Sequence, residues 1–223
     1  MPGLPLFPLG TVLFPGAQLP LQVFEPRYLA LVRDLQDRPQ QERVFGVVAI
    51  RSGHEVGPGA ARELFDTGTS ARIDAVAVLT SPPSRVQLLT TGVRRFHLDG
   101  IDESAGTPYL TGQVSWLDEA QVTHADRDLA ATLLAEATAY RAVLGAPALD
   151  TAGLRADVDP GAAGFVAVDA VALGLADRQR VLDAPDVTSR LRVALALVRR
   201  ERALVGRLGS VPQPPDLGAL GLN

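Results

Sequence analysis

The first half of the chain carries apolar residues in short clusters or in alternation, as β-strands do. Gln18 to Phe24 alternates polar and apolar residues, and Val44 to Ile50 is β-branched and nearly all apolar. These patterns predict a half-buried strand and a fully buried strand, respectively. Prolines interrupt Leu4 to Leu9, which predicts an edge strand or an extended segment. Further strands are predicted at 68–80, 85–91, 94–99 and 109–117. Gly, Pro and Ser separate them, so a small barrel or sandwich is favoured.

One helix is predicted to interrupt these strands. Pro26 suits the first helical position, where its missing N–H costs nothing. Four apolar residues then recur at helical spacing, and Pro39 lies just beyond the predicted end; they are Tyr28, Leu31, Val32 and Leu35.

Helical spacing dominates the second half. Thr123 and Asp126 have the spacing of a capping box before a run of Ala and Leu that ends at Gly145. Asp159 and Pro160 are predicted to open a second helix, with Phe165, Val168, Ala172 and Leu175 on one face. Asp177 is predicted to cap a short helix through Leu182. Asp186 or Thr188 then precedes a long helix to about Leu208.

The order of these elements predicts an α+β chain with three parts. We expect a β-rich domain over residues 1–122, a helical subdomain over 123–209 and a flexible tail over 210–223. The tail prediction depends on its Pro-Gln-Pro-Pro sequence.

Composition narrows the functional classes. The net charge of -4 argues weakly against a free-standing nucleic-acid binder. The chain has no cysteine, which excludes disulfides and thiolate zinc sites and is compatible with the cytoplasm. The prolines of the apolar N-terminus argue against a signal peptide. The longest apolar runs fall short of the ~18 residues that a membrane span needs.

Lysine is absent, so all 21 basic residues are arginine. A P-loop needs a lysine for the β- and γ-phosphates, so the loop with Gly53, Gly57 and Gly59 is interpreted as a surface loop. A Ser-Lys dyad is excluded for the same reason, and no Gly-x-Ser-x-Gly elbow is present. Ser52 and His54 lie two residues apart in that loop, where their spacing carries little meaning.

The three histidines do not form a metal-binding motif. His54, His97 and His124 are widely spread, without a His-x-His or His-Glu-x-x-His pattern. The stretch Asp157 to Gly161 resembles the start of a calcium loop but lacks the later acidic ligands, so a helix N-cap explains it better. We therefore expect no metal, no cofactor and no catalytic residues.

The last predicted helix carries a basic surface. At about 100° per residue, four arginines cluster opposite the apolar arc of this helix; they are Arg192, Arg199, Arg200 and Arg207. A solvated face that suits the helix macrodipole is one interpretation. An acidic partner or RNA is the alternative, although few aromatic residues are available for stacking on bases.

The opening run contains the most distinctive motifs. Phe14-Pro15-Gly16 predicts a turn, and Phe24-Glu25-Pro26-Arg27-Tyr28 predicts the corner between a strand and a helix. Glu25 precedes the helix, where its carboxylate can accept hydrogen bonds from the free amides. We interpret all eight residues as structural.

This run resembles the start of the Lon protease N-terminal, substrate-binding domain family. The matching pieces begin with Leu4 to Pro8, Val12 to Gly16, Leu19 to Leu21 and Phe24 to Tyr28. Later matches include Phe45 to Val48, Gly92 to Phe96, Pro108 to Leu110 and Ser189 to Leu191, so the likeness covers roughly residues 4–208. It implies a β-rich, PUA-like pseudo-barrel followed by a C-terminal helical bundle.

The resemblance also implies a function. In Lon proteases this module recognises substrate, while separate domains unfold and cleave it. The sequence stops before any ATPase or protease domain, so we expect a stand-alone, non-catalytic, cytoplasmic protein-binding module. It would bind unfolded or peptide segments of other proteins as an adaptor, sensor or holdase. RNA or nucleotide binding is the alternative, by analogy with other PUA-like barrels. A third alternative is an enzyme whose site is assembled from scattered residues.

Overall fold

The protein was analysed as a computed structural model, which describes residues 3–53, 55, 61–79, 85–119, 122–147, 149 and 159–208. The chain divides into two compact units, Met1–Asp118 and Glu119–Asn223. The sequence pattern predicts this boundary slightly later, between residues 122 and 123. The predicted tail over 210–223 lies outside the described residues.

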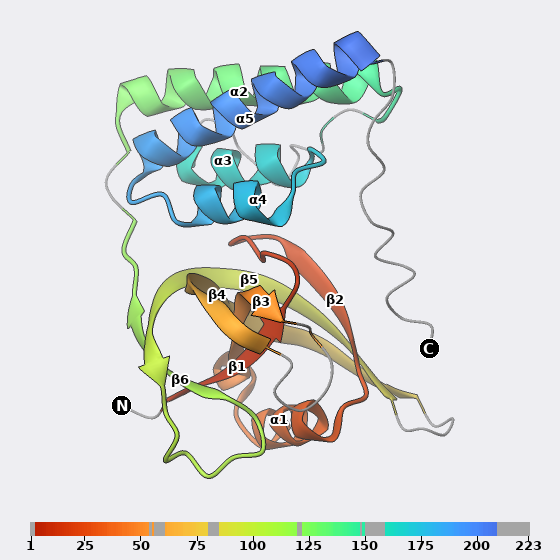
Figure 1. Cartoon of the computed structure of the whole chain (residues 1–223), viewed down its shortest axis with the longest axis vertical. Helices are drawn as coiled ribbons and strands as arrows, with labels where there is room; N and C mark the ends of the chain where they lie inside the picture. Colours follow the sequence, from red (N-terminus) through yellow and green to blue (C-terminus); the bar gives the residue numbers. More distant parts are fainter. Residues whose placement is uncertain are drawn as a thin grey trace. The chain divides into compact units, whose positions relative to one another are not determined.

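In the first unit, the described residues form a six-stranded mixed sheet and one α-helix (Figure 1). Its strands are β1 (Leu4–Leu9), β2 (Gln18–Val23), β3 (Val44–Gly53), β4 (Ala61–Leu79), β5 (Arg85–Ile101) and β6 (Thr111–Trp116). The sheet order is β2-β5-β4-β3-β1-β6, and β5 also pairs with β6. That extra pairing closes β5, β4, β3, β1 and β6 into a ring, whereas β5 is the one partner of β2 within the part of the chain that the structure describes. The predicted pseudo-barrel is therefore confirmed.

Two apolar clusters hold this unit together. The larger one lies under α1 (Pro26–Gln36), whose buried residues are Tyr28, Leu31, Val32 and Leu35. Within it, the rings of Phe7 and Tyr28 stack with their centroids 4.0 Å apart. The smaller cluster is centred on Leu6, Val48 and Phe96. A short 3-10 helix, η1 (Gln40–Glu42), connects α1 to β3.

One long strand replaces two predicted strands. We expected a break between 91 and 94 because Gly92 weakens a strand pattern, but β5 runs without interruption from Arg85 to Ile101. The glycine is needed for a close approach instead. A Cβ at Gly92 would lie 2.2 Å from the carbonyl oxygen of Phe14. The N–H of Gly16 donates to the carbonyl of Gly92 over 2.8 Å, so the turn at residues 14–16 is bonded directly to β5.

The described residues of the second unit form four helices (Figure 1). They are α2 (His124–Val143), α3 (Pro160–Asp169), α4 (Leu175–Leu182) and α5 (Val187–Leu208). The two long helices α2 and α5 pack along each other, and α3 packs against both. Their buried contacts are mostly small or aliphatic, with Leu133, Ala137, Leu191, Ala194 and Val198 fully buried.

In the helical unit, three of the four predicted caps are present. Thr123 and Asp126 form the capping box of α2. The carboxylate of Asp159 accepts from the N–H groups of Gly161 and Ala162 at the start of α3, and that of Asp186 accepts from the N–H of Ser189 in α5. The prediction for Asp177 was wrong, because Gly174 is the N-cap of α4 and Asp177 lies in its first turn.

The predicted second helix was too long. It ends at Asp169 with Ala170 as its C-cap, so Ala172 lies outside it and Leu175 begins α4. The N–H of Leu173 bonds to the carbonyl of Val171, which takes the backbone out of the helical register. None of the described helices is long and apolar enough to cross a membrane.

Candidate functional site

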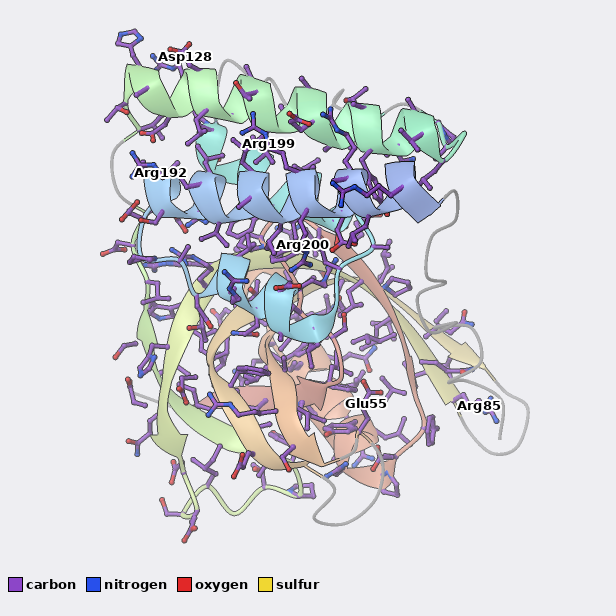
Figure 2. All side chains as sticks on the ribbon, turned by 45° about the horizontal axis from the view of Figure 1, so that its top comes forward. Glu55, Arg85, Asp128, Arg192, Arg199 and Arg200 are labelled. Atoms are coloured by element: carbon purple, nitrogen blue, oxygen red, sulfur yellow. The ribbon has the colours of Figure 1, made fainter. Side chains whose placement is uncertain are left out.

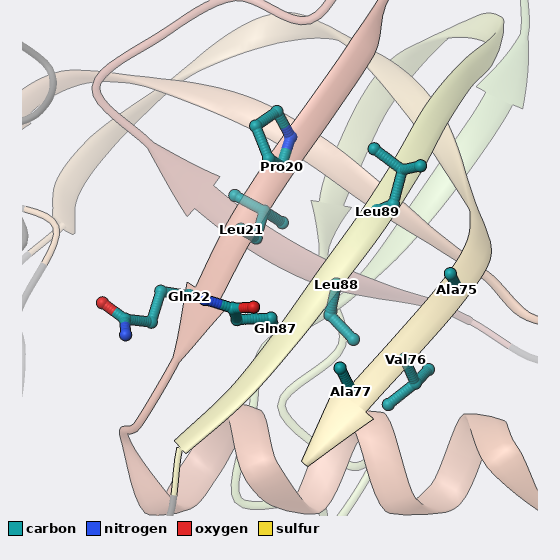
Figure 3. Close-up of a pocket in the computed structure, with 9 residues that line it drawn as sticks. All are labelled: Pro20, Leu21, Gln22, Ala75, Val76, Ala77, Gln87, Leu88 and Leu89. Atoms are coloured by element: carbon teal, nitrogen blue, oxygen red, sulfur yellow. The ribbon is translucent and has the colours of Figure 1, made fainter. Parts of the chain in front are cut away.

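An open groove that could hold a ligand lies along strands β2, β5 and β4 of the sheet (Figure 3). The groove has a volume of about 500 Å³. Its lining residues are Pro20, Leu21, Gln22, Ala75, Val76, Ala77, Gln87, Leu88 and Leu89. All nine come from strands of the first unit, so their spacing is fixed by sheet pairing.

Strand register explains why these side chains meet. Pro20 pairs with Leu89 and Leu89 with Ala75, while Gln22 pairs with Gln87 and Gln87 with Ala77. Directly opposed residues project from the same face of a sheet. Pro20, Leu89 and Ala75 therefore form an apolar row across the three strands. Gln22, Gln87 and Ala77 form the next row, which carries the two side-chain amides. Leu89 remains 37% exposed, whereas its neighbour Leu88 points into the core and is 2% exposed.

The chemistry of the groove suits binding rather than catalysis. None of its nine lining residues carries a charge, a thiol or an imidazole, and the amides of Gln22 and Gln87 are its polar side chains. An amide can donate and accept hydrogen bonds but is neither a nucleophile nor a general base at neutral pH. This lining therefore fits an apolar, uncharged segment of a ligand.

The turn motif at residues 14–16 has a structural position. Phe14 is fully buried, Pro15 is partly buried, and Gly16 has a φ of +82°, a conformation that favours glycine. The N–H of Ala17 donates to the carbonyl of Phe14 over 3.1 Å, which closes the turn. These residues fix the path of the chain into β2, one wall of the groove.

The corner motif joins β2 to α1. Glu25 is the N-cap of α1, but our prediction that its side chain caps the helix was wrong. Its carboxylate accepts from Nε of Arg27 over 3.1 Å instead, and the N–H groups of Tyr28 and Leu29 donate to the backbone carbonyl of Glu25. The guanidinium of Arg27 also stacks 4.5 Å from the ring centre of Tyr28.

This corner is anchored to a distant part of the chain. Nη2 of Arg27 donates to the carbonyl of Glu55 over 3.2 Å, and the Glu55 carboxylate accepts from the N–H of Gly10. Burial of Tyr28 raises the pKa of its hydroxyl to about 12.

Phe24 differs from the rest of the motif, because 43% of its surface is exposed at the end of β2.

Two of the four arginines of the predicted basic surface are paired with acids (Figure 2). Arg199 points toward α2, where its Nε lies 3.1 Å from Oε1 of Glu136. Arg200 points toward α4 and binds Asp177 over 2.7 Å, and it also binds Glu201 over 2.6 Å. Arg192 and Arg207 are exposed. Because Arg199 and Arg200 are directed to different acids, the four arginines do not form one concentrated positive surface.

The described residues that were considered for catalysis or metal binding lie on separate elements. His97 is exposed on β5, His124 is the first residue of α2, and Ser52 is exposed near the end of β3. His54, Gly57, Gly59 and Asp157 lie outside the described residues. Within the described ranges, no group of three or more His, Asp or Glu side chains is placed to hold a metal ion.

Sequence reasoning did not identify the groove. It predicted the individual strands but not the pairing that places Leu89 beside Pro20 and Ala75. One signal was present: Leu88 and Leu89 are consecutive apolar residues in a strand, so one of them had to face away from the core.

Comparisons with known proteins agree on one family. The family described as the ATP-dependent protease La (LON) substrate-binding domain matches residues 3–200. Lon protease 2 of Sorangium cellulosum is 34% identical over 205 residues, and Lon protease of Anaeromyxobacter dehalogenans is 30% identical over 208 residues. These alignments cover 88% and 91% of this chain but 24% of each relative, so the chain spans about a quarter of their length.

Solved structures give the same answer for the fold. A Lon N-terminal domain protein from Xanthomonas campestris aligns with a TM-score of 0.62 and 27% identity, over 88% of this chain and 98% of the other. The N-terminal domain of the Mycobacterium avium complex Lon protease aligns with a TM-score of 0.63, over 88% of this chain and 97% of the other. At 19% identity, the latter supports the α+β fold alone. Sequence and structure together show that this chain belongs to the Lon substrate-binding domain family.

Proposed function

We propose that this protein is a non-catalytic recognition module that binds exposed apolar segments of other proteins in the groove of β2, β5 and β4. The observation that carries the proposal is the uncharged lining of this groove in a family described as substrate-binding. We propose that the protein acts in the cytoplasm as an adaptor, a sensor or a holdase.

The physical basis is burial of apolar surface. Removing apolar area from water contributes about 25 cal/mol per Å², and the exposed part of Leu89 is available for this burial. Gln22 and Gln87 can bond to the backbone of a bound segment, whose polar groups would otherwise lose their water partners. An open groove with few polar groups can bind segments of many different sequences. A module that recognises unfolded segments requires this broad specificity.

Fluorescence anisotropy tests the proposal. The ligand is a labelled, reduced and alkylated disulfide protein, which stays unfolded. We expect saturable binding that Leu89→Gln weakens by about 1 kcal/mol, or roughly fivefold in Kd. Ile101→Gln is the matched control, because Ile101 lies on the same strand with 40% exposure but outside the groove. Absence of binding, or equal losses in both variants, contradicts the proposal.

The RNA alternative gains no support from the described surface. Ion pairs with Glu136, Asp177 and Glu201 offset the charges of Arg199 and Arg200, on which phosphate binding would depend.

A further inference from the structure

The inference concerns the open edge of β2 and deepens the function proposed above, on which it rests. In the sheet of the described residues, β2 pairs with β5 on one side and stands first in the strand order. The N–H of Gly92 donates to the carbonyl of Ala17 over 2.9 Å, one residue before β2. Backbone groups alternate along an antiparallel strand, so those of Leu19, Leu21 and Val23 face β5. Those of Gln18, Pro20 and Gln22 therefore face outward.

This edge can still pair with a further strand. Proline lacks an N–H, but Pro20 occupies an outward position, so its pairing with β5 is not weakened. The edge offers carbonyl acceptors at Gln18, Pro20 and Gln22 and N–H donors at Gln18 and Gln22. Natural edges are commonly protected by charged residues, but Gln18–Val23 has none, and Pro20 is its one protective feature.

The outer face beside this edge is apolar. Pro20 and Leu89 form an opposed pair there, and Phe24 is exposed one residue beyond β2. Alternate side chains of an added strand would lie over this face. They would extend the apolar row formed by Pro20, Leu89 and Ala75, as cross-strand neighbours do within a sheet.

One charge marks the end of this face. Arg85 is two residues before Gln87 on β5, so both project to the same side, about 7 Å apart along the strand. Figure 2 labels Arg85 at the start of β5. Arg85 has no ion-pair partner among the described residues, and no acidic residue lines the groove. A ligand with a carboxylate at this end would complement it.

We propose that the open edge of β2 binds an extended apolar segment of another protein as an added β-strand, with an acidic side chain of that segment beside Arg85. Backbone hydrogen bonds then provide affinity that is independent of sequence. The apolar face and Arg85 provide the selectivity.

N-methylation of a probe peptide tests the strand geometry. The probe is a labelled short peptide in which Val alternates with Thr, with one Asp near an end. A strand added to β2 directs every second N–H of the peptide toward the edge. Methylation at those positions is expected to weaken binding about tenfold or more, and methylation at the intervening positions much less. Equal losses at all positions would overturn strand addition while leaving the proposed function intact.

Two other results of the binding experiment would overturn strand addition. If the unmethylated probe and the unfolded protein both fail to bind, the proposed function and this inference both fail. Sedimentation of the same samples can instead show that the chain associates with itself. If Gln22→Pro abolishes this self-association and the peptide does not compete with it, the edge of β2 binds a second copy of the chain. That result overturns the inference.

A charge exchange tests Arg85. Arg85→Glu should weaken the Asp peptide by about fivefold, in line with an exposed ion pair, and should strengthen binding of a peptide with Lys in place of Asp. Arg33→Glu on α1 is the control, because Arg33 is exposed and outside the groove. If Arg85→Glu and Arg33→Glu give the same ratio of Asp to Lys binding, the assignment of Arg85 is wrong.

Discussion

The groove of the sheet unit and the helical unit differ in their charged residues. In the sheet unit, three strands form a groove whose nine lining residues include no charge. In the helical unit, charged side chains cap helices and join them, as in Arg199 with Glu136 and Arg200 with Asp177. This difference suggests that the charges of the helical unit stabilise its own fold, whereas the groove is available to a ligand.

The buried arginine of α5 shows this internal use of charge. Arg190 is fully buried, its Nη2 lies 2.5 Å from Oε2 of Glu119, and its guanidinium lies 4.3 Å from the ring centre of Phe165. Gly164 leaves room for it, since a Cβ there would lie 3.1 Å from Cδ of Arg190. Arg190 thus joins α5 to α3 and to the start of the helical unit.

The largest predicted effect is on this unit. Arg190→Ala should lower the free energy of unfolding by about 2–5 kcal/mol, because it leaves a cavity where a large, fully buried side chain had packed and removes the partner of Glu119. Helical circular dichroism should show an earlier transition, whereas the fluorescence of Trp116, the single tryptophan, reports on the sheet unit and should change little. Arg192→Ala on the exposed face of α5 is the control. Equal shifts of both signals would contradict the separation of the units.

A smaller loss of stability, confined to the sheet unit, is expected from a second substitution. Gly92→Ala places a Cβ against the backbone carbonyl of Phe14, which cannot rotate away, so we expect a loss of about 1–3 kcal/mol. The Trp116 transition should move first. Gly100→Ala on the same strand meets no atom within 4 Å and should be nearly neutral. A Gly92→Ala protein as stable as the Gly100→Ala protein would show that the turn at 14–16 is not constrained by β5.

The two units should also respond differently to pH. Hydrogen bonds from Thr123 and Thr188 hold the pKa of Asp126 below its usual value, the Arg200 hydrogen bond lowers that of Asp177, and Ser189 lowers that of Asp186. A lowered carboxyl pKa contributes stability above about pH 4, which is lost as the pH falls through the folded-state pKa. Asp74, held low by Thr91, adds one such group to the sheet unit.

Two buried tyrosines determine how the stability of the sheet unit changes at alkaline pH. Burial raises the pKa of Tyr28 and of Tyr109 to about 12, and the hydrogen bond to Asp34 also raises that of Tyr109. This contribution is present below about pH 10 and is lost as the pH rises toward 12. Acid should therefore shift the helical signal more than Trp116 fluorescence, and alkali should do the reverse. The opposite order in thermal melts across pH would refute this assignment.

Local sequence patterns predicted most helices and strands correctly, but they did not predict which of these elements pack or pair with one another. Thr123 with Asp126, and Asp159 with Pro160, marked helix starts because capping depends on neighbouring residues. The continuity of β5 through Gly92 could not be predicted, because it depends on a carbonyl far away in the sequence. The same holds for the groove, which needs the register of three strands. Arg190 gave a weaker signal, since it lies beside Leu191 and Ala194 on the apolar arc of α5.

The central claim is that ligands bind to the β2-β5-β4 groove rather than to the helical unit. Hydrogen exchange of the full chain, with and without the unfolded protein, measures this directly. We predict slower exchange in Gln18–Val23 and at Arg85 to Leu89, with α2 and α5 unchanged. Slower exchange confined to α2 and α5, with β2 unaffected, would contradict the claim.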